Sequence, residues 1–337
     1  MKTIFDVAAL AGVSKSTVSR VISGSGSIKE STRRKVERAM AELNYVPNQL
    51  AQGIRTGRTR TIALMVPETM NLFYNELLYK IEAIARQKDY MVFLCNCGID
   101  TAVATQYITG LRQRNVDGLI YCFYRDNDVT DELYHISSEL PVVFLDNPLG
   151  NHLNTSYVSS DGLTDTAEIV HHHRSTNAKS IAFIGISDIC NITYRYMGYK
   201  AGLAACGYEF DPELVCMMDY EQVQESHFKL GYSAAEKLMQ GARKPDAIIA
   251  GTDMLAIGAM RYLQEKGYDI PGQVAITGYD DIHLSSMISP PLSTISQSIE
   301  RIAQETMDIL LHKIEIDNGY NRSYQARSTF IKRGSTR

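Results

Sequence analysis

The sequence predicts an α/β protein in which a small all-α head precedes a larger, doubly wound body of two lobes. Three observations lead to this class. Residues 1–46 carry small apolar residues at helical spacing, and from residue 61 short apolar runs alternate with amphipathic stretches, as in βαβ units. Residues 1–60 also hold four Lys and seven Arg against one Asp and three Glu, a net charge of +7, whereas the remaining residues carry −11. We therefore divide the chain into a head (1–46), a linker (47–60) and a body (61–337).

The composition is that of a folded protein that stays inside the cell. The chain has 337 residues, of which 45% are apolar, and its six cysteines are scattered. Scattered cysteines are typical of reduced thiols, and no window approaches the roughly 18 apolar residues of a membrane helix. We therefore expect a cytoplasmic protein with no membrane partner. The basic head indicates that this part binds a polyanion, although a simply solvated basic surface has the same charge.

The head is expected to contain three short helices that pack into a compact bundle. The T-x-x-D pattern from Thr3 to Asp6 opens the first helix, Gly12 ends it, and Ser14 caps the second. A third helix covers about residues 31–44. The residues expected to pack together are Val7, Ala8 and Ala11 of the first helix, Val18, Val21 and Ile22 of the second, and Val36, Met40 and Leu43 of the third.

The second helix has a polar outer face. Its residues are Lys15, Ser16, Thr17, Ser19 and Arg20. Hydroxyls and backbone amides at a helix start suit phosphate oxygens, and Lys or Arg suits the O6 and N7 atoms of guanine in the major groove. This is the arrangement of a DNA-binding helix-turn-helix, in which the start of the second helix contacts base edges. The alternative is a packing bundle with a solvated polar face.

The linker contains a segment that can form a helix of about two turns, at residues 49–55. A helix of that length is not stable alone in water, and Gly53 weakens it further. Its aliphatic Ile54, next to Arg55, suits a segment that folds only on DNA and wedges into the minor groove. A flexible linker is the alternative interpretation.

The body carries eight apolar runs that are typical of strands. They form two sets of four, at 62–67, 91–95, 118–122 and 142–146, and at 181–186, 214–218, 247–251 and 274–278. Helical stretches between the runs indicate two parallel sheets, with a ligand cleft where the carboxyl ends of the strands meet. A dinucleotide-dependent enzyme would share this architecture. However, the turn VPETMNLFYNE has no G-x-G-x-x-G and no Walker lysine, and no G-x-S-x-G is present, so we expect neither an enzyme nor a cofactor.

A triplet of histidines, His171 to His173, raises the question of a metal site. Adjacent residues on a helix point about 100° apart, so the three rings cannot converge on one ion. We expect a solvent-facing helix end and no metal.

The head and linker resemble a known family of bacterial regulators, the lactose/purine repressor family. The resemblance is carried by the string A-x-x-A-G-V-S-x-x-T-V-S-R and by the segment ITGYDDIHLSSMISPPLSTISQ at 276–297. One departure is Lys29, which stands where the family usually has a capping Ser. The resemblance implies base-reading by Lys15, Ser16 and Arg20, phosphate contacts by Ser14, Thr17, Ser19, Thr32 and Tyr45, and a minor-groove wedge at Ile54 with Arg55.

The body resembles the periplasmic sugar-binding fold, which implies an effector site between its lobes. The implied residues are Phe73, Tyr74, Asp146, Arg195, Thr252, Asp280 and Gln297. Asp146, Thr252 and Asp280 each follow an apolar strand, which places them at the expected cleft, although such residues also cap helices. Thr193 and Leu72 depart from the family pattern, so we leave the sugar unnamed.

Taken together, these features predict a transcription regulator, most simply a repressor, that binds a palindromic operator as a homodimer. One small head makes too few base contacts for useful specificity, and a two-fold dimer contacts two half-sites. A sugar or sugar derivative in the cleft would control the head, acting as inducer or as corepressor. Two alternatives stay open: control by a protein corepressor, and a soluble sugar-binding or enzymatic protein whose basic head is incidental.

Overall fold

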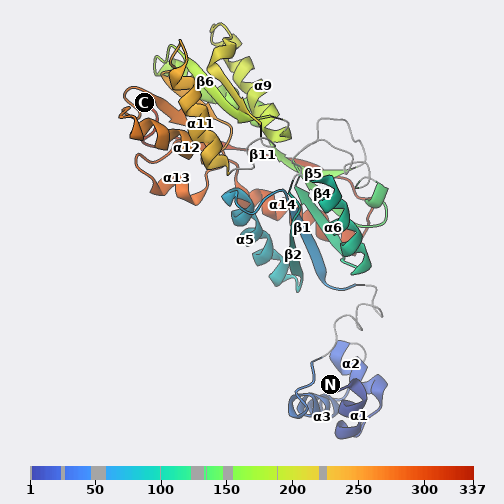
Figure 1. Cartoon of the computed structure of the whole chain (residues 1–337). Coiled ribbons are helices and arrows are strands. Elements are labelled where there is room, and N and C mark those ends of the chain that lie inside the picture. Colours follow the sequence, from blue (N-terminus) through green and yellow to red (C-terminus); the bar gives the residue numbers. More distant parts are fainter. Residues whose placement is uncertain are drawn as a thin grey trace. The chain divides into compact units, whose positions relative to one another are not determined.

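The computed structural model describes residues 2–23, 27–46, 58–98, 100–122, 133, 135–146, 155–187, 189–219 and 226–337. They fall into two compact units, residues 1–59 and residues 60–337 (Figure 1). Among the described helices, none is long and apolar enough to cross a membrane.

In its described residues, the first unit is a bundle of three helices, α1 (Ile4–Ala11), α2 (Lys15–Ser23) and α3 (Glu30–Glu42). The backbone N–H of Thr3 donates to the Asp6 carboxylate at 2.7 Å, and Gly12 ends α1 with a left-handed φ of 66°. Ser14 caps α2, because its Oγ accepts a hydrogen bond from the backbone N–H of Thr17 at 3.1 Å. Lys29 precedes α3 without a side-chain cap. The buried core of the bundle consists of Val7, Ala8, Val18, Val21, Val36 and Ala39.

The first lobe of the body is built on a sheet of six parallel strands in the order β11-β5-β4-β3-β1-β2. Its strands are β1 (Thr61–Val66), β2 (Met91–Asn96), β3 (Gly118–Cys122), β4 (Val142–Leu145), β5 (Ser156–Ser160) and β11 (Ser323–Ala326). Alternate residues of β1 pack against different helices. One face is covered by α5 (Leu72–Gln87) and α14 (Ile299–Glu315), and the other by α6 (Thr101–Gln113).

The second lobe is built on a sheet of four parallel strands in the order β7-β6-β8-β9. Its strands are β6 (Ile181–Ile186), β7 (Val215–Met218), β8 (Ala247–Ala250) and β9 (Ala275–Thr277), and an antiparallel pair is added by β10 (Thr294–Ser296) and β12 (Thr329–Ile331). Its helices are α8 (Gly162–Ser175), α9 (Cys190–Ala205), the 3-10 turn η1 (Pro212–Leu214), α11 (His227–Gln240), α12 (Asp253–Glu265) and α13 (His283–Met287). The helices pack in pairs, α8 with α9 and α11 with α12.

Between its described elements, the chain crosses from one lobe to the other three times, after β5, after β10 and after β11. All eight expected strands are present, but the expectation of two successive sets of four was wrong for the first lobe. Two further strands, β5 and β11, join its sheet, and α14 returns from late in the chain to pack beside α5. The lobes are therefore interleaved in sequence, so a change in their arrangement acts on three connections at once.

Candidate functional site

The second helix of the head, α2, has one buried face and one exposed face. Val18 is fully buried and Val21 nearly so, because they follow helical spacing toward α1 and α3. Lys15, Ser16 and Arg20, the residues expected to contact bases, are exposed. The hydrophobic face thus fixes the helix on the bundle and leaves its cations and hydroxyls accessible.

Three hydroxyls gather at the start of α2. The Ser14 Oγ lies 2.7 Å from the Ser16 Oγ and 2.9 Å from the Thr17 Oγ1. Together with the backbone N–H groups of Lys15 and Ser16 in the first turn of the helix, they form a group of donors suited to a phosphate oxygen. This arrangement suits contact with a DNA backbone, and the side chains of Lys15 and Arg20 beside it are of the types that contact base edges.

The remaining predicted phosphate contacts are half-buried. Ser19 lies on α2 and Thr32 in the first turn of α3, and Tyr45 packs against the core of the bundle. Ile54 and Arg55, the predicted minor-groove wedge, lie outside the described residues.

One aromatic residue of the head was missed by the sequence reasoning. Phe5 lies in the first turn of α1 and is 64% exposed. The Lys15 Nζ is 4.7 Å from the centroid of its ring. The only signal in the sequence was an aromatic residue outside the apolar stripe of the first helix.

In the body, three of the predicted effector residues meet in one buried cluster. Arg195 comes from α9, Asp280 follows β9, and Gln297 follows β10. The Gln297 Nε2 donates to the Asp280 Oδ1 at 2.6 Å, and a guanidinium nitrogen of Arg195 lies 3.5 Å from the same oxygen. The Gln297 Oε1 accepts a hydrogen bond from the Ser160 Oγ at 2.9 Å. Because Ser160 ends β5, the cluster joins the two lobes.

The electrostatics of this cluster are dominated by burial. Loss of solvent raises the pKa of Asp280 well above its usual range, and the neighbouring Arg195 guanidinium acts in the opposite direction. Arg195 stacks 3.6 Å above the Tyr279 ring and donates to the Gly251 carbonyl. Its Nε–H is buried and has no hydrogen-bond partner among the described residues. Such an orphan donor is costly unless a further acceptor, such as a ligand oxygen, satisfies it.

A pocket of about 320 Å³ opens beside Arg195. Asp146, a fourth predicted effector residue, lines it together with Arg195. The other lining residues are Ser159, Ser160, Asp161, Gly162, Leu163, Thr164, Tyr194 and Gln325. The wall is therefore rich in hydroxyls and carboxylates, which are suitable partners for the hydroxyl groups of a small polar molecule.

The last three predicted effector residues have visible structural roles. Thr252 caps α12, because its Oγ1 accepts a hydrogen bond from the backbone N–H of Leu255 at 3.3 Å. Phe73 is half-buried and packs against the cores of both lobes, and Tyr74 is buried in the first lobe with its ring 5.5 Å from that of Phe73. Helix capping, the alternative reading of the strand-end residues, thus holds for Thr252.

A second contact between the lobes was missed by the sequence reasoning. Glu68, just after β1, lies 3.0 Å from the His227 Nε2 at the start of α11. The His227 Nδ1 lies 3.4 Å from the Thr252 Oγ1. Burial lowers the pKa of His227, the Glu68 carboxylate raises it, and Arg195 lowers it. An acidic residue at the carboxyl end of the first strand, in VPE, was the available signal.

The histidine triplet does not face solvent, contrary to the sequence expectation. His173 is fully buried, its Nε2 lies 2.8 Å from the Thr277 Oγ1, and burial lowers its pKa to about 3. The His172 Nε2 lies 3.1 Å from the Thr336 Oγ1, and only His171 is exposed. The end of α8 is covered by β9 and the C-terminal segment, which the local sequence does not reveal. Among the described residues, no group of three possible metal ligands occurs.

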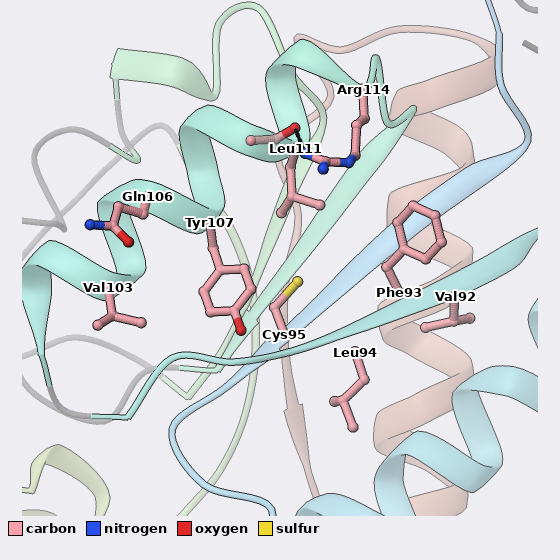
Figure 2. A pocket seen from close by; sticks show the side chains of 10 residues that line it. Val92, Phe93, Leu94, Cys95, Val103, Gln106, Tyr107, Leu111 and Arg114 are labelled. Atoms are coloured by element: carbon pink, nitrogen blue, oxygen red, sulfur yellow. Dashed lines mark hydrogen bonds between the residues drawn. The ribbon is translucent and has the colours of Figure 1, made fainter.

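A second, larger hollow lies along the edge of the first lobe, between β2 and α6 (Figure 2). Its volume is about 580 Å³. Leu94, Cys95, Tyr107 and Leu111 are among the mainly apolar residues drawn around it, and Arg114 donates to the Gly110 carbonyl at 3.0 Å. It contains none of the predicted effector residues, and it follows an edge strand whose Phe93 and Leu94 are about 40% exposed.

Known proteins resemble both units. A sequence model described as bacterial regulatory proteins, lacI family, matches residues 3–48, and a periplasmic binding protein-like domain matches residues 170–336. The HTH-type transcriptional repressor PurR of Vibrio atlanticus is 31% identical over 346 residues, covering 100% of this chain and 99% of its own length. The ribose operon repressor of Escherichia coli K12 is 30% identical over 349 residues, covering 99% and 100% of the two chains.

Solved structures agree with these relatives. The lac repressor bound to ONPG in its repressed state has a TM-score of 0.88 at 26% identity, with 99% of each chain covered. A LacI family regulator from Enterococcus faecium with bound ribose has a TM-score of 0.72 at 26% identity, covering 82% of this chain and 98% of its own. These relatives are regulators and not enzymes. The chain therefore belongs to the LacI family, and is a DNA-binding transcriptional repressor with a ligand-binding body.

Proposed function

We propose that this repressor binds a palindromic operator as a homodimer and that a sugar or sugar derivative in the cleft of its body controls the binding. The observation that carries the DNA-binding part is the exposed row of Lys15, Ser16 and Arg20 on α2, opposite its buried valines. Cations on a rigidly held helix can contact base edges in a major groove. One such helix spans only a few base pairs, so two heads are needed for useful specificity.

The edge of the first lobe is where we place the second copy of the chain. Along β2, Met91 is 56% exposed, and Phe93 and Leu94 are about 40% exposed, beside the apolar hollow of Figure 2. An exposed, apolar edge strand tends to pack against another chain, so a second copy of this chain is a suitable partner for it. The lac repressor is described as a dimer bound to operator in one solved structure, which supports the same assembly here.

The proposal that a sugar binds the body rests on the cluster of Arg195, Asp280 and Gln297 beside the pocket that Asp146 lines. Carboxylate and amide oxygens accept hydrogen bonds from sugar hydroxyls, and the orphan Nε–H of Arg195 donates to a sugar oxygen. Among the similar solved structures, a LacI family regulator is described with bound ribose, and the transcriptional regulator CelR is described as a complex with cellobiose. A pocket lined by hydroxyls and carboxylates favours a small molecule as the effector over the protein corepressor that the sequence also allowed.

Control of the head follows from the interleaved lobes. A ligand that binds one arrangement of the lobes more tightly shifts the protein toward that arrangement, and the linker at 47–60 connects this change to the head. A differential affinity of about 3 kcal/mol would change operator affinity by more than a hundredfold. An inducer lowers operator affinity by this route and a corepressor raises it.

The test begins with selection of bound sequences from random DNA, followed by fluorescence anisotropy on the selected site at fixed salt. We expect a two-fold symmetric site bound by two chains, and a change in its affinity with one of a panel of sugars that includes ribose and cellobiose. Preference for no sequence over scrambled DNA would refute operator binding. A selected site that no sugar affects, but that a protein fraction of a cell lysate does affect, would replace the sugar by a protein corepressor.

A further inference from the structure

One contact in the body pairs an acid and a base from different lobes. The Glu68 Oε1, just after β1 of the first lobe, lies 3.0 Å from the His227 Nε2, at the start of α11 in the second lobe. Both side chains are shielded from water, with 13% of Glu68 and 4% of His227 exposed. Two lone pairs would repel each other at this distance, so the ring hydrogen lies on Nε2, between the ring and the carboxylate. The contact therefore stabilises the arrangement of the lobes seen in this structure.

The other nitrogen of the ring is held within the second lobe. The His227 Nδ1 lies 3.4 Å from the Thr252 Oγ1, which accepts a hydrogen bond from the backbone N–H of Leu255 at 3.3 Å. The Thr252 hydroxyl can therefore direct its own hydrogen to Nδ1, and this fixes the ring with Nε2 toward Glu68. The neutral ring satisfies both of its neighbours, whereas a second ring proton would displace the hydrogen of Thr252.

The surroundings of the ring favour its neutral form. Among the described residues, the charged groups that act on His227 are the Glu68 carboxylate and the Arg195 guanidinium of α9. Burial is the largest influence and lowers the pKa of His227 from its ordinary value of 6.5, Glu68 raises it, and Arg195 lowers it further. When the lobes separate, water reaches the ring in place of Glu68, and its pKa returns toward the ordinary value. Separation of the lobes is therefore coupled to the uptake of a proton by the ring.

We propose that Glu68 and His227 form a proton-sensitive clasp, which holds the two lobes together at neutral pH and lets them separate in acid. The pKa of the ring is lowered while the lobes are together, so the stability that the clasp contributes is present above pH 6.5 and is lost as the pH falls below that value. Between pH 7.5 and pH 5.5, the ratio of separated to joined lobes should rise by up to about tenfold. The clasp acts within the body and needs neither operator nor sugar. Where the proposed function also holds, the linker passes the same pH dependence to operator affinity.

The distance between the lobes is the quantity to measure. A keto-bearing unnatural amino acid replaces Glu82 on α5 and Gln240 on α11, both exposed, and carries nitroxide labels that do not react with the native cysteines. The labelled chain is diluted into an excess of unlabelled chain, so that distances within one chain dominate. Pulsed electron paramagnetic resonance then gives the distribution of distances at pH 7.5 and at pH 5.5. We expect the population at longer distance to grow by up to about tenfold at the lower pH.

Two variants and a control separate the clasp from other titrating groups. The amide of His227→Gln does not titrate, so its distribution should be the same at both pH values. Glu68→Ala lacks the first-lobe half of the clasp, so the longer distance should already be populated at pH 7.5. His283→Gln should keep the whole response, because the exposed ring of His283 is not needed for the bond from its backbone N–H to Glu76. The proposal is overturned if pH leaves the unaltered protein unchanged, or if His227→Gln keeps the response. Either result leaves operator binding and sugar control untouched.

Discussion

Arg20 and Arg34 are both exposed arginines of the head, but their surroundings differ. Arg34 lies on α3, and its Nε is 3.2 Å from the Glu30 carboxylate. Arg20 lies on the exposed face of α2. We expect Arg20→Ala to reduce discrimination at one base pair of each half-site by about 1–3 kcal/mol, because a guanidinium recognises guanine with two hydrogen bonds. Arg34→Ala removes the same charge without changing the preferred sequence. Selection from random DNA gives the preferred sequence of each variant. If Arg20→Ala preferred the same sequence as the unaltered protein, base recognition by Arg20 would be excluded.

At the same scale, His173 makes the free energy of unfolding depend on pH. Burial lowers its folded pKa to about 3 from an ordinary value of 6.5, so the unfolded chain binds more protons between these values. The free energy of unfolding should therefore fall as the pH falls through this window, by about 1 kcal/mol between pH 7 and pH 5.5. His173→Gln should be less stable at pH 7, because the ring fills a buried site, but should lose this part of the pH dependence. Urea unfolding at the two pH values measures this change in the free energy of unfolding. An equal change in both proteins would contradict the assignment to His173.

At the scale of elements, the sequence predicted the strands that have a local apolar pattern, but not the strands that depend on long-range pairing. The strands β1, β3, β4, β6 and β8 are buried apolar runs, and such runs identify themselves in the sequence. The strands β5, with sequence SYVSS, and β11, with sequence SYQA, are polar. β5 pairs with β4 on one side, and β11 pairs with β5 on the other across more than 160 residues. No periodicity reports such a pairing. For the same reason the sequence could place Asp280 at a strand end, and the family resemblance could imply Gln297, but neither could reveal Ser160 beside them.

The exposed edge strand β2 carries an element-scale prediction. Leu94→Asp places a charge where the second copy of the chain is proposed to pack, and burying it there would cost about 2 kcal/mol or more. We expect the dimer to dissociate at roughly thirtyfold higher protein concentration, and operator affinity to fall because the two heads are no longer linked. Met197→Asp on α9 is the control, since Met197 is 43% exposed and Leu94 is 41% exposed. Sedimentation velocity measures the oligomeric state. If both variants remained dimers at the same concentrations, the interface would not lie at β2.

At the scale of the whole body, four contacts among the described residues join the lobes near the proposed effector site. Ser160 bonds Gln297, Glu68 contacts His227, and the Glu76 carboxylate accepts a hydrogen bond from the backbone N–H of His283 at 2.7 Å. The Tyr279 hydroxyl also donates to the Ser160 Oγ at 3.3 Å, and its ring stacks on Arg195. Of the two residues bonded to Ser160, Gln297 is the one that also bonds Asp280. We therefore expect Gln297 to link ligand binding at Asp280 to the first lobe.

Gln297→Ala tests that coupling in full. The substitution removes the bridge between Asp280 and Ser160 but leaves Arg195 beside Asp280, so a sugar found by the screen should still bind, although more weakly. Because coupling is reciprocal, the ratio of operator affinities with and without the sugar equals the ratio of sugar affinities with and without operator. We expect this ratio to approach one in Gln297→Ala and to be unchanged in Gln325→Ala, whose residue lines the same pocket from β11 and is exposed. Calorimetry gives sugar affinity and anisotropy gives operator affinity. If Gln297→Ala bound sugar and retained the whole ratio, the signal would have to pass through the other contacts between the lobes.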